Sequence, residues 1–263
     1  MSTTTAQSNA TFIALEADLM ALLDSISNLP VKPPSLYLDL EGIDLGRHGS
    51  ISILSLYIAP TQIIYLIDIH SLGMAAFSTT NKCGTSMKSI LESSTIPKVV
   101  FDIRNDSYAL FSLFQLSIDC IKDLQLMELA YRTGSREFVS SLAKCIEKES
   151  PISAVAKTKW KLTKEFGHRL FAPEKGGRYK VFNERPLSPE ITEYYKQDVV
   201  LLPGLYDVYN TKLRQSGLAF WRVHVRFMTK DRIKLSRSSG YDGKSKCNAL
   251  GWNDKTIESE IES

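Results

Sequence analysis

Residues 36–41 read Leu-Tyr-Leu-Asp-Leu-Glu, and this stretch decides the fold. Successive side chains of a β-strand point to opposite faces, so the three leucines face one way and Tyr37, Asp39 and Glu41 face the other. An early, apolar strand of this kind is typically central in its sheet and covered on both sides. The two carboxylates would then lie about 7 Å apart on one partly buried face. Keeping both ionised there is unfavourable by several kcal/mol unless a cation compensates them.

The segments around this strand predict the fold class. Two further strand-like runs follow at residues 50–57 and 63–69, separated by turn-rich pieces. The pattern then changes to a short strand at residues 98–101 and to a series of helices. These helices are expected at residues 87–91, 106–116, 124–131, 138–147 and 188–212. Antiparallel strands first, and alternating strands and helices later, indicate an α/β domain with a mixed β-sheet.

The chain divides into one main domain and its flanks. We expect the domain at residues 34–213. Residues 1–9 are small and polar, which favours a disordered N-terminus. Apolar residues then recur with helical spacing, which predicts an N-terminal helix within residues 10–33. Residues 214–263 are expected to be a basic C-terminal extension.

The composition excludes several classes of protein. Of 263 residues, 43% are hydrophobic and 23% charged, so the chain is not wholly disordered. No apolar run approaches the ~20 residues of a membrane span, and the N-terminal segment lacks the basic leader of a signal peptide. The four cysteines form no C-x-x-C pair, which argues against a zinc ribbon or a disulfide scaffold. We therefore expect an intracellular protein, cytoplasmic or nuclear, without a membrane partner.

Positive charge is concentrated in two stretches, although the net charge is only +3. Residues 157–185 hold nine Lys and Arg against three Glu, and residues 212–246 hold ten against two Asp. Basic stretches on an otherwise acidic body favour a polyanionic partner; the alternative is that both are solvated surfaces. In the second stretch, residues 220–227 could form a strand or a docking helix. The first stretch contains four aromatic residues that could stack on bases or pack beneath the surface: Trp160, Phe166, Phe171 and Tyr179.

Two more acidic residues fall on apolar faces of predicted helices. Asp106 shares a helical stripe with Leu110 and Phe114, which indicates a core-facing carboxylate rather than a solvated one. The alternative is a helix cap, a common role for an Asp near a helix start. In the last helix, Tyr194 and Asp198 are four residues apart and so lie on one face.

Together these acids favour a hard metal ion. Asp39, Glu41, Asp106 and Asp198 offer only carboxylate oxygens, which suit Mg²⁺ or Mn²⁺. Two such ions about 3.5–4 Å apart can activate a water molecule and stabilise the leaving oxygen of a phosphodiester. The four histidines, by contrast, lack the clustered spacing of a metal site.

With these motifs in order, the sequence resembles the DEDDy-type 3′–5′ exonuclease domains of the ribonuclease D/Egalitarian-like family, which have a ribonuclease H-like fold. The resemblance covers residues 36–209. Its first motif, D-x-E, matches Asp39 and Glu41, and its third, Y-x-x-x-D, matches Tyr194 and Asp198. The remaining matches are Asp106 with Phe114, the D-x-Q of Asp123 and Gln125, and the R-P-L of residues 185–187.

The resemblance implies a metal-dependent 3′–5′ exonuclease that releases nucleoside 5′-monophosphates from a single-stranded 3′ end of RNA or DNA. Asp39 would bridge two Mg²⁺ or Mn²⁺ ions, and Glu41 and Asp198 would hold the first. Asp106 would support the second ion. Tyr194 would orient the attacking water.

Other functions stay open at this stage. Tyr108 stands where many relatives carry Asp, and Gly42 and Ile43 follow the D-x-E where several carry a bulky residue. A catalytically inactive domain that acts as an RNA-binding or protein-interaction adaptor is therefore the main alternative. A ribonuclease H-like nuclease that cleaves internally is a third, although the Y-x-x-x-D helix favours the exonuclease branch. The histidine variant of the family would need His at position 193. This chain has Glu193 there, so the tyrosine variant is the better match.

Overall fold

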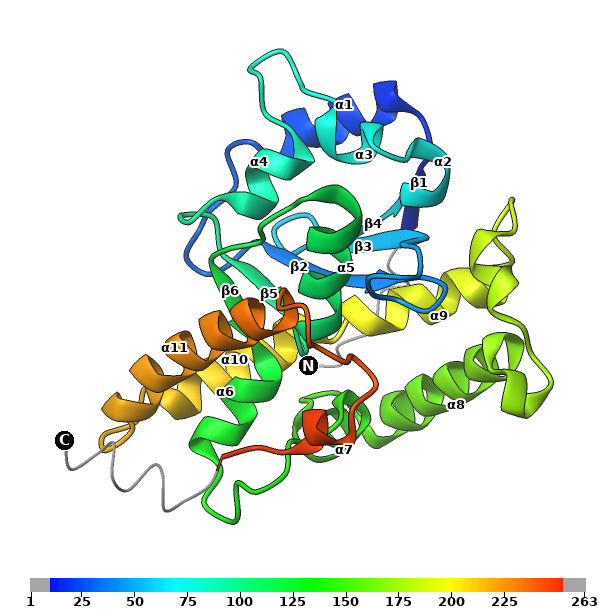
Figure 1. Ribbon diagram of the computed structural model, residues 1–263. Coiled ribbons are helices and arrows are strands. Elements are labelled where there is room, and N and C mark those ends of the chain that lie inside the picture. The colour runs from blue at the N-terminus through cyan, green and yellow to red at the C-terminus, as the bar shows by residue number, and fades with distance from the viewer. Residues whose placement is uncertain (1–9, 253–263) are drawn as a thin grey trace.

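The core of the protein is a six-stranded mixed β-sheet, seen in a computed structural model that describes residues 10–252 (Figure 1). The strand order is β1-β4-β3-β2-β5-β6. The strands are β1 (Ala10–Ile13), β2 (Leu36–Glu41), β3 (Ile53–Ile58), β4 (Ile63–Asp68), β5 (Lys98–Val100) and β6 (Ile121–Asp123). Strand β2 pairs antiparallel with β3 and parallel with β5, so the D-x-E strand is central, as predicted. The mixed sheet confirms the predicted α/β class.

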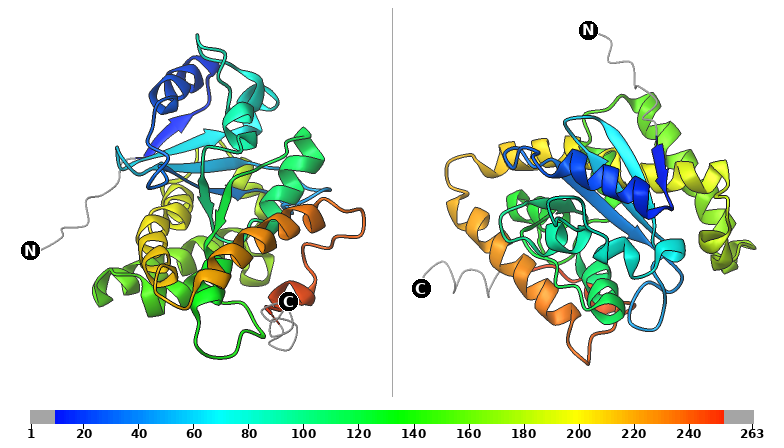
Figure 2. Two further views of the ribbon diagram at one scale, coloured as in Figure 1. Left: turned by 90° about the vertical axis from the view of Figure 1, so that its left-hand side faces the viewer. Right: turned by 90° about the horizontal axis from the view of Figure 1, so that it is seen from above.

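Helices cover both faces of the sheet (Figure 2). The helices in the first half of the chain are α1 (Glu16–Ile26), α2 (Ile69–Leu72), α3 (Ala75–Ser78), α4 (Met87–Glu92), α5 (Arg104–Phe114) and α6 (Leu124–Tyr131). Those that follow are α7 (Leu142–Glu149), α8 (Ala154–Phe171), α9 (Pro189–Val199), α10 (Leu202–Leu213) and α11 (Ala219–Ser236). Helices α1, α3, α4 and α5 form one apolar layer with the leucines of β2. Helices α6, α9 and α10 pack on the opposite face, the one that Tyr37 joins.

The predicted N-terminal helix starts later than expected, because residues 10–13 form strand β1. This strand pairs in parallel with β4 and so extends the sheet by one edge strand. The helical spacing of the first apolar residues was misleading, since Phe12 and Leu15 are exposed and only Ile13 of the early group is buried. Helix α1 then buries Leu19, Leu22, Leu23 and Ile26 against the sheet.

Two other predicted helices have different boundaries. The long helix expected at residues 188–212 is interrupted at residues 200–201, and a second helix, α10, begins at Leu202. Pro203, the second residue of α10, cannot donate the backbone hydrogen bond that would continue α9. The helix expected from residue 138 begins at Leu142, where the Ser141 side chain caps it. Phe138 instead forms a β-bridge with Leu250.

The two basic stretches are largely helical. Most of the first one is α8, whose Trp160 and Gly167 are buried while Phe166 is exposed. Phe171 packs against Phe182 inside the molecule, so only part of the aromatic set is available at the surface. In the second stretch, α11 contacts α5, α6 and β6 along one edge of the sheet, so the docking helix and not the strand is observed.

Some expectations lie beyond the described part of the chain. Residues 1–9, for which disorder is predicted, lie outside the described residues. The end of the predicted C-terminal extension, residues 253–263, also lies outside them. Within residues 10–252, none of the helices has both the length and the apolar character needed to cross a membrane.

Candidate active site

Strand β2 presents two carboxylates to the same face of the sheet. Asp39 lies opposite Ser55 of β3 and Glu41 lies opposite Ile53. Asp39 and Glu41 are half-buried, whereas the leucines between and before them are buried on the other face. The alternation expected from the sequence is therefore present, and it directs both acids toward the layer that contains α9.

Helix α9 supplies the third carboxylate. Its first turn is fixed by Ser188, whose side chain accepts a hydrogen bond from the Ile191 backbone N–H, and by Pro189 at a position that needs no donor. Tyr194 and Asp198 follow one turn apart and are both buried. Helix α9 packs against β2 and β3, so this buried side meets the two acids of the strand.

Asp39, Glu41 and Asp198 converge on one point. Each offers a carboxylate oxygen, and these oxygens all lie within 4.8 Å of one another. Burial raises the pKa of Glu41 to about 8, with a further contribution from the charge of Asp198. Burial and then the charge of Asp198 also raise the pKa of Asp39 well above its usual range. Three carboxylates held this close fit a hard divalent cation, which would compensate the charge that burial disfavours.

Asp106 lies near this group but outside the three-carboxylate cluster. It is buried in the first turn of α5, as the sequence predicted. Burial raises its pKa, and the charges of Asp102 and Glu41 add to that effect. Its own charge in turn raises the pKa of Asp39. Asp106, on α5, therefore interacts electrostatically with Asp39 and Glu41 of the cluster.

Tyr194 completes the site. Its hydroxyl donates a hydrogen bond to Glu41, and burial together with the charge of Glu41 raises the pKa of the tyrosine. The ring packs edge-on against Phe171, with centroids 5.2 Å apart. Gly167 of α8 lies against the other part of the ring, at a distance that leaves no room for a Cβ atom. Tyr194 is therefore a neutral hydrogen-bond donor in a fixed orientation.

Lys164 is a residue of this site that sequence reasoning missed. Its Nζ lies 2.5 Å and 2.6 Å from the two carboxylate oxygens of Asp198 and 3.3 Å from the centre of the Tyr194 ring. The sequence predicts only contacts with a polyanion, stacking on bases or a solvated surface for this basic stretch. A signal existed: on a helix, residues 160, 164, 167 and 171 fall on one face, so this lysine interrupts a stripe of Trp, Gly and Phe.

Asp123, the first residue of D-x-Q, has a structural position. Its side chain is fully buried and accepts hydrogen bonds from the backbone N–H groups of Asp102, Ile103 and Gln125. It also forms an ion pair of 2.8 Å with Arg232 of α11. Asp123 therefore fixes the starts of α5 and α6, and with them the place of Asp106.

Arg185 of the R-P-L motif and Tyr108 also have packing roles. Arg185 Nε donates to the fully buried Asp68 carboxylate at 2.8 Å, which ties the segment before α9 to the end of β4. The ring of Tyr108 packs edge-on against Tyr241, 5.1 Å between centroids, and beneath Arg47. Tyr108 thus belongs to the packing between α5, the loop after β2 and the segment after α11.

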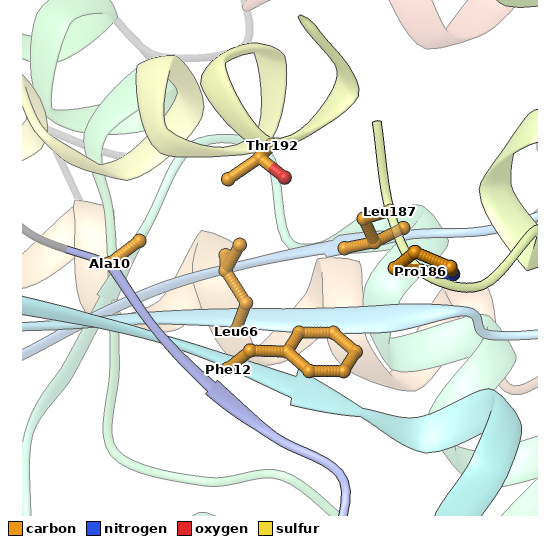
Figure 3. A pocket seen from close by; sticks show the side chains of 6 residues that line it. All are labelled: Ala10, Phe12, Leu66, Pro186, Leu187 and Thr192. Carbon is orange, nitrogen blue, oxygen red and sulfur yellow. The ribbon is translucent and has the colours of Figure 1, made fainter. Parts of the chain in front are cut away.

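An apolar pocket of about 220 Å³ lies elsewhere, between β1, β4 and the start of α9 (Figure 3). It is lined by Ala10, Phe12, Leu66, Pro186, Leu187 and Thr192. This lining contains no ionisable side chain, so the chemistry described above belongs to the carboxylate cluster.

Comparisons with known proteins agree with this fold. The family model for 3′–5′ exonuclease matches residues 11–214, and the chain belongs to that family. No curated protein matches the sequence. The motif-based resemblance to the ribonuclease D-like exonucleases is thereby confirmed.

Solved structures give the same ribonuclease H-like fold. RNase D of Trypanosoma brucei in complex with RNA U12 has a TM-score of 0.74 at 18% identity, over 96% of this chain and 79% of that one. Escherichia coli RNase D, an exoribonuclease involved in structured RNA processing, has a TM-score of 0.60 at 17% identity, over 88% and 51%. Brucella melitensis NrnC bound to pGG has a TM-score of 0.55 at 16% identity, over 84% and 95%.

Proposed function

We propose that this protein is a metal-dependent 3′–5′ exonuclease that hydrolyses the terminal phosphodiester of a single-stranded 3′ end, in RNA or DNA, to a nucleoside 5′-monophosphate. The observation that carries the proposal is the convergence of three carboxylates within 4.8 Å, with the Tyr194 hydroxyl bonded to one of them. Membership of the 3′–5′ exonuclease family supports the reaction type. The RNA and pGG in the two bound relatives support a nucleic-acid substrate.

The carboxylates would hold two divalent ions, Mg²⁺ or Mn²⁺. Asp39, Glu41 and Asp198 would hold the first, and Asp39 and Asp106 would support the second. When bound, such ions lower the pKa of a water molecule and stabilise the leaving oxygen of a phosphodiester. The raised pKa values of Asp39 and Glu41 support this assignment, since an ion would stabilise their charged forms.

Tyr194 would orient the attacking water. Its hydroxyl already donates to Glu41, a proposed ligand, and its oxygen can accept a hydrogen bond from a water on that ligand. Because Phe171 and Gly167 fix the ring, the hydroxyl needs little reorganisation when substrate binds. None of these residues forms a covalent bond to the substrate in this scheme.

The test is hydrolysis of a 5′-labelled single-stranded oligoribonucleotide in Mn²⁺, with the matching deoxyribonucleotide in parallel. We expect a ladder that shortens from the 3′ end, nucleoside 5′-monophosphate as product, and no cleavage in chelator. Asp39→Ala should abolish the ladder, whereas Asp18→Ala on the exposed side of α1 should leave it unchanged.

Three results would contradict the proposal. Full activity of Asp39→Ala would remove the cluster from the reaction. Cleavage of a circular single strand would instead identify an internal nuclease. Binding of RNA by the folded wild-type protein in Mn²⁺ without hydrolysis would identify a non-catalytic adaptor.

A further inference from the structure

Lys164 is held inside the carboxylate cluster by the packing of α8 on α9. The Trp160 indole N–H donates to the Gln197 carbonyl at 3.1 Å, one turn before Lys164. Gly167 contacts the Tyr194 ring about one turn after it. These two close contacts fix the helix on both sides of the lysine, so its side chain is aimed at Asp198.

The ammonium group of Lys164 binds a carboxylate that a metal would also need. It lies within hydrogen-bond distance of both carboxylate oxygens of Asp198, at 2.5 Å and 2.6 Å. One oxygen of the same carboxylate belongs to the group that could hold an ion with Asp39 and Glu41. An ammonium and a divalent cation would repel each other there, so the two cannot share Asp198 favourably.

The charge balance favours the divalent ion. The ammonium pairs with the carboxylate of Asp198 alone, whereas a divalent ion among the three acids would also stabilise the charged forms of Asp39 and Glu41. The Lys164 side chain is 18% exposed, against 10% for Asp198, so it has a route to solvent. A lysine stem is long and flexible, and its ammonium is a compact, strongly hydrated charge. It can leave while α8 stays in place.

We propose that Lys164 is a resident counter-ion that competes with the divalent metal for Asp198 and swings toward solvent when the metal binds. This inference rests on the proposed function, because it assumes a metal among these carboxylates. Lys164 then sets the metal concentration at which the site fills and stabilises the metal-free protein. It is a positioning residue for Asp198 and not a catalytic one.

The test is the Mn²⁺ affinity of Lys164→Met, measured by titration calorimetry without nucleic acid. Methionine keeps an unbranched apolar stem and removes the charge. Hydrogen bonds to charged groups contribute about 1.5–3 kcal/mol, so we expect roughly tenfold to hundredfold tighter Mn²⁺ binding. Lys164→Arg keeps the charge and should bind Mn²⁺ much more weakly than Lys164→Met. Lys161→Met, an exposed position on the same helix, should match wild type.

Thermal unfolding supplies a second measurement. In chelator, Lys164→Met should unfold at a lower temperature than wild type, because Asp198 loses its ion pair with Lys164. In saturating Mn²⁺ the two should unfold at similar temperatures. The Mn²⁺-induced rise in Tm is therefore larger for the variant, and a purely structural lysine would give the same rise in both.

Unchanged or weaker Mn²⁺ binding by Lys164→Met overturns this inference, and loss of RNA affinity alongside it would assign the lysine to substrate phosphates instead. The proposed function survives that outcome as long as wild-type protein hydrolyses RNA in Mn²⁺. If neither folded protein binds Mn²⁺, the metal site itself is refuted, and both proposals fall together.

Discussion

Gly167 offers a sharp test of the site because it touches the ring of Tyr194. A Cβ atom at this position would lie 2.4 Å from Cδ2 of Tyr194 and 2.8 Å from its Cβ and Cγ. The Tyr194 ring cannot simply move aside, because Phe171 packs against it with centroids 5.2 Å apart. Gly167→Ala must therefore shift Tyr194 or separate α8 from α9.

The expected effect on stability is small. Overpacking of this kind is unfavourable by about 1–3 kcal/mol. Alanine in a helix interior is more favourable than glycine by about 1 kcal/mol, which offsets part of that loss. We therefore expect the free energy of unfolding to fall by about 0–2 kcal/mol, which leaves the protein folded.

The expected effect on catalysis is much larger. A displacement of about 1 Å in a positioned group can lower a rate by roughly 100-fold. The hydroxyl of Tyr194 would lose its alignment with Glu41, so the proposed water-orienting contact would weaken. Activity should thus fall by about two orders of magnitude while the fold survives.

The assay pairs initial rates on a single-stranded oligoribonucleotide in saturating Mn²⁺ with chemical denaturation of the same sample. The matched control is Gly204→Ala in α10, where a Cβ would meet only the ring of Pro151, at 3.3 Å. The control should keep wild-type activity. If Gly167→Ala were as active as wild type and at least as stable, the contact with Tyr194 would carry neither packing nor function, and the reasoning would fail.

Two further predictions concern charge. In chelator, the free energy of unfolding should fall as pH rises from about 4.5 to about 8, because folded Glu41 keeps its proton up to a pKa of about 8 while the unfolded chain releases it near 4.5. One such proton changes the free energy of unfolding by at most about 1.4 kcal/mol per pH unit, and saturating Mn²⁺ should remove this dependence on pH. Urea unfolding at pH 5 to 8 measures it, and a free energy of unfolding that stays constant with pH in chelator would contradict the prediction. Asp123→Asn should lower the free energy of unfolding by about 3–5 kcal/mol, because it leaves the buried Arg232 without its closest carboxylate. Asp231→Asn, at an exposed position beside Arg232, should have little effect in the same denaturation experiment, and equal curves for the two variants would refute this role of Asp123.

The sequence was most informative where local pattern and burial agree. Asp39 and Glu41 interrupt an otherwise apolar strand, and Asp198 lies on the buried side of its helix, so the same inconsistency marks each of them. A polar group on an apolar face needs a partner, and that need is visible without coordinates. An acid on an otherwise apolar face of a strand or helix was therefore the signal that identified the three converging residues, Asp39, Glu41 and Asp198.

Features that depend on distant partners could not be predicted in this way. Strand β1 exists because the edge of β4 accepts it, and its four residues fit a helical stripe equally well. Helix α8 buries only Trp160 and Gly167, so its narrow buried stripe gives little periodic signal. Lys164 and Asp198 are 34 positions apart and meet only because α8 and α9 pack together.

The contact between Arg232 and Asp123 separates two boundaries that are easily confused. Recognisable family sequence ends at residue 214, yet the counter-ion of the buried Asp123 comes from residue 232. Further along, Trp252 stacks on Trp221, with ring centroids 5.2 Å apart, and so returns the chain to α11. A fragment trimmed to the family match would keep every candidate ligand but lose the support beneath α5. If such a fragment were inactive in an assay, the loss of the Arg232–Asp123 contact would explain it, and the result would not test the role of the candidate ligands.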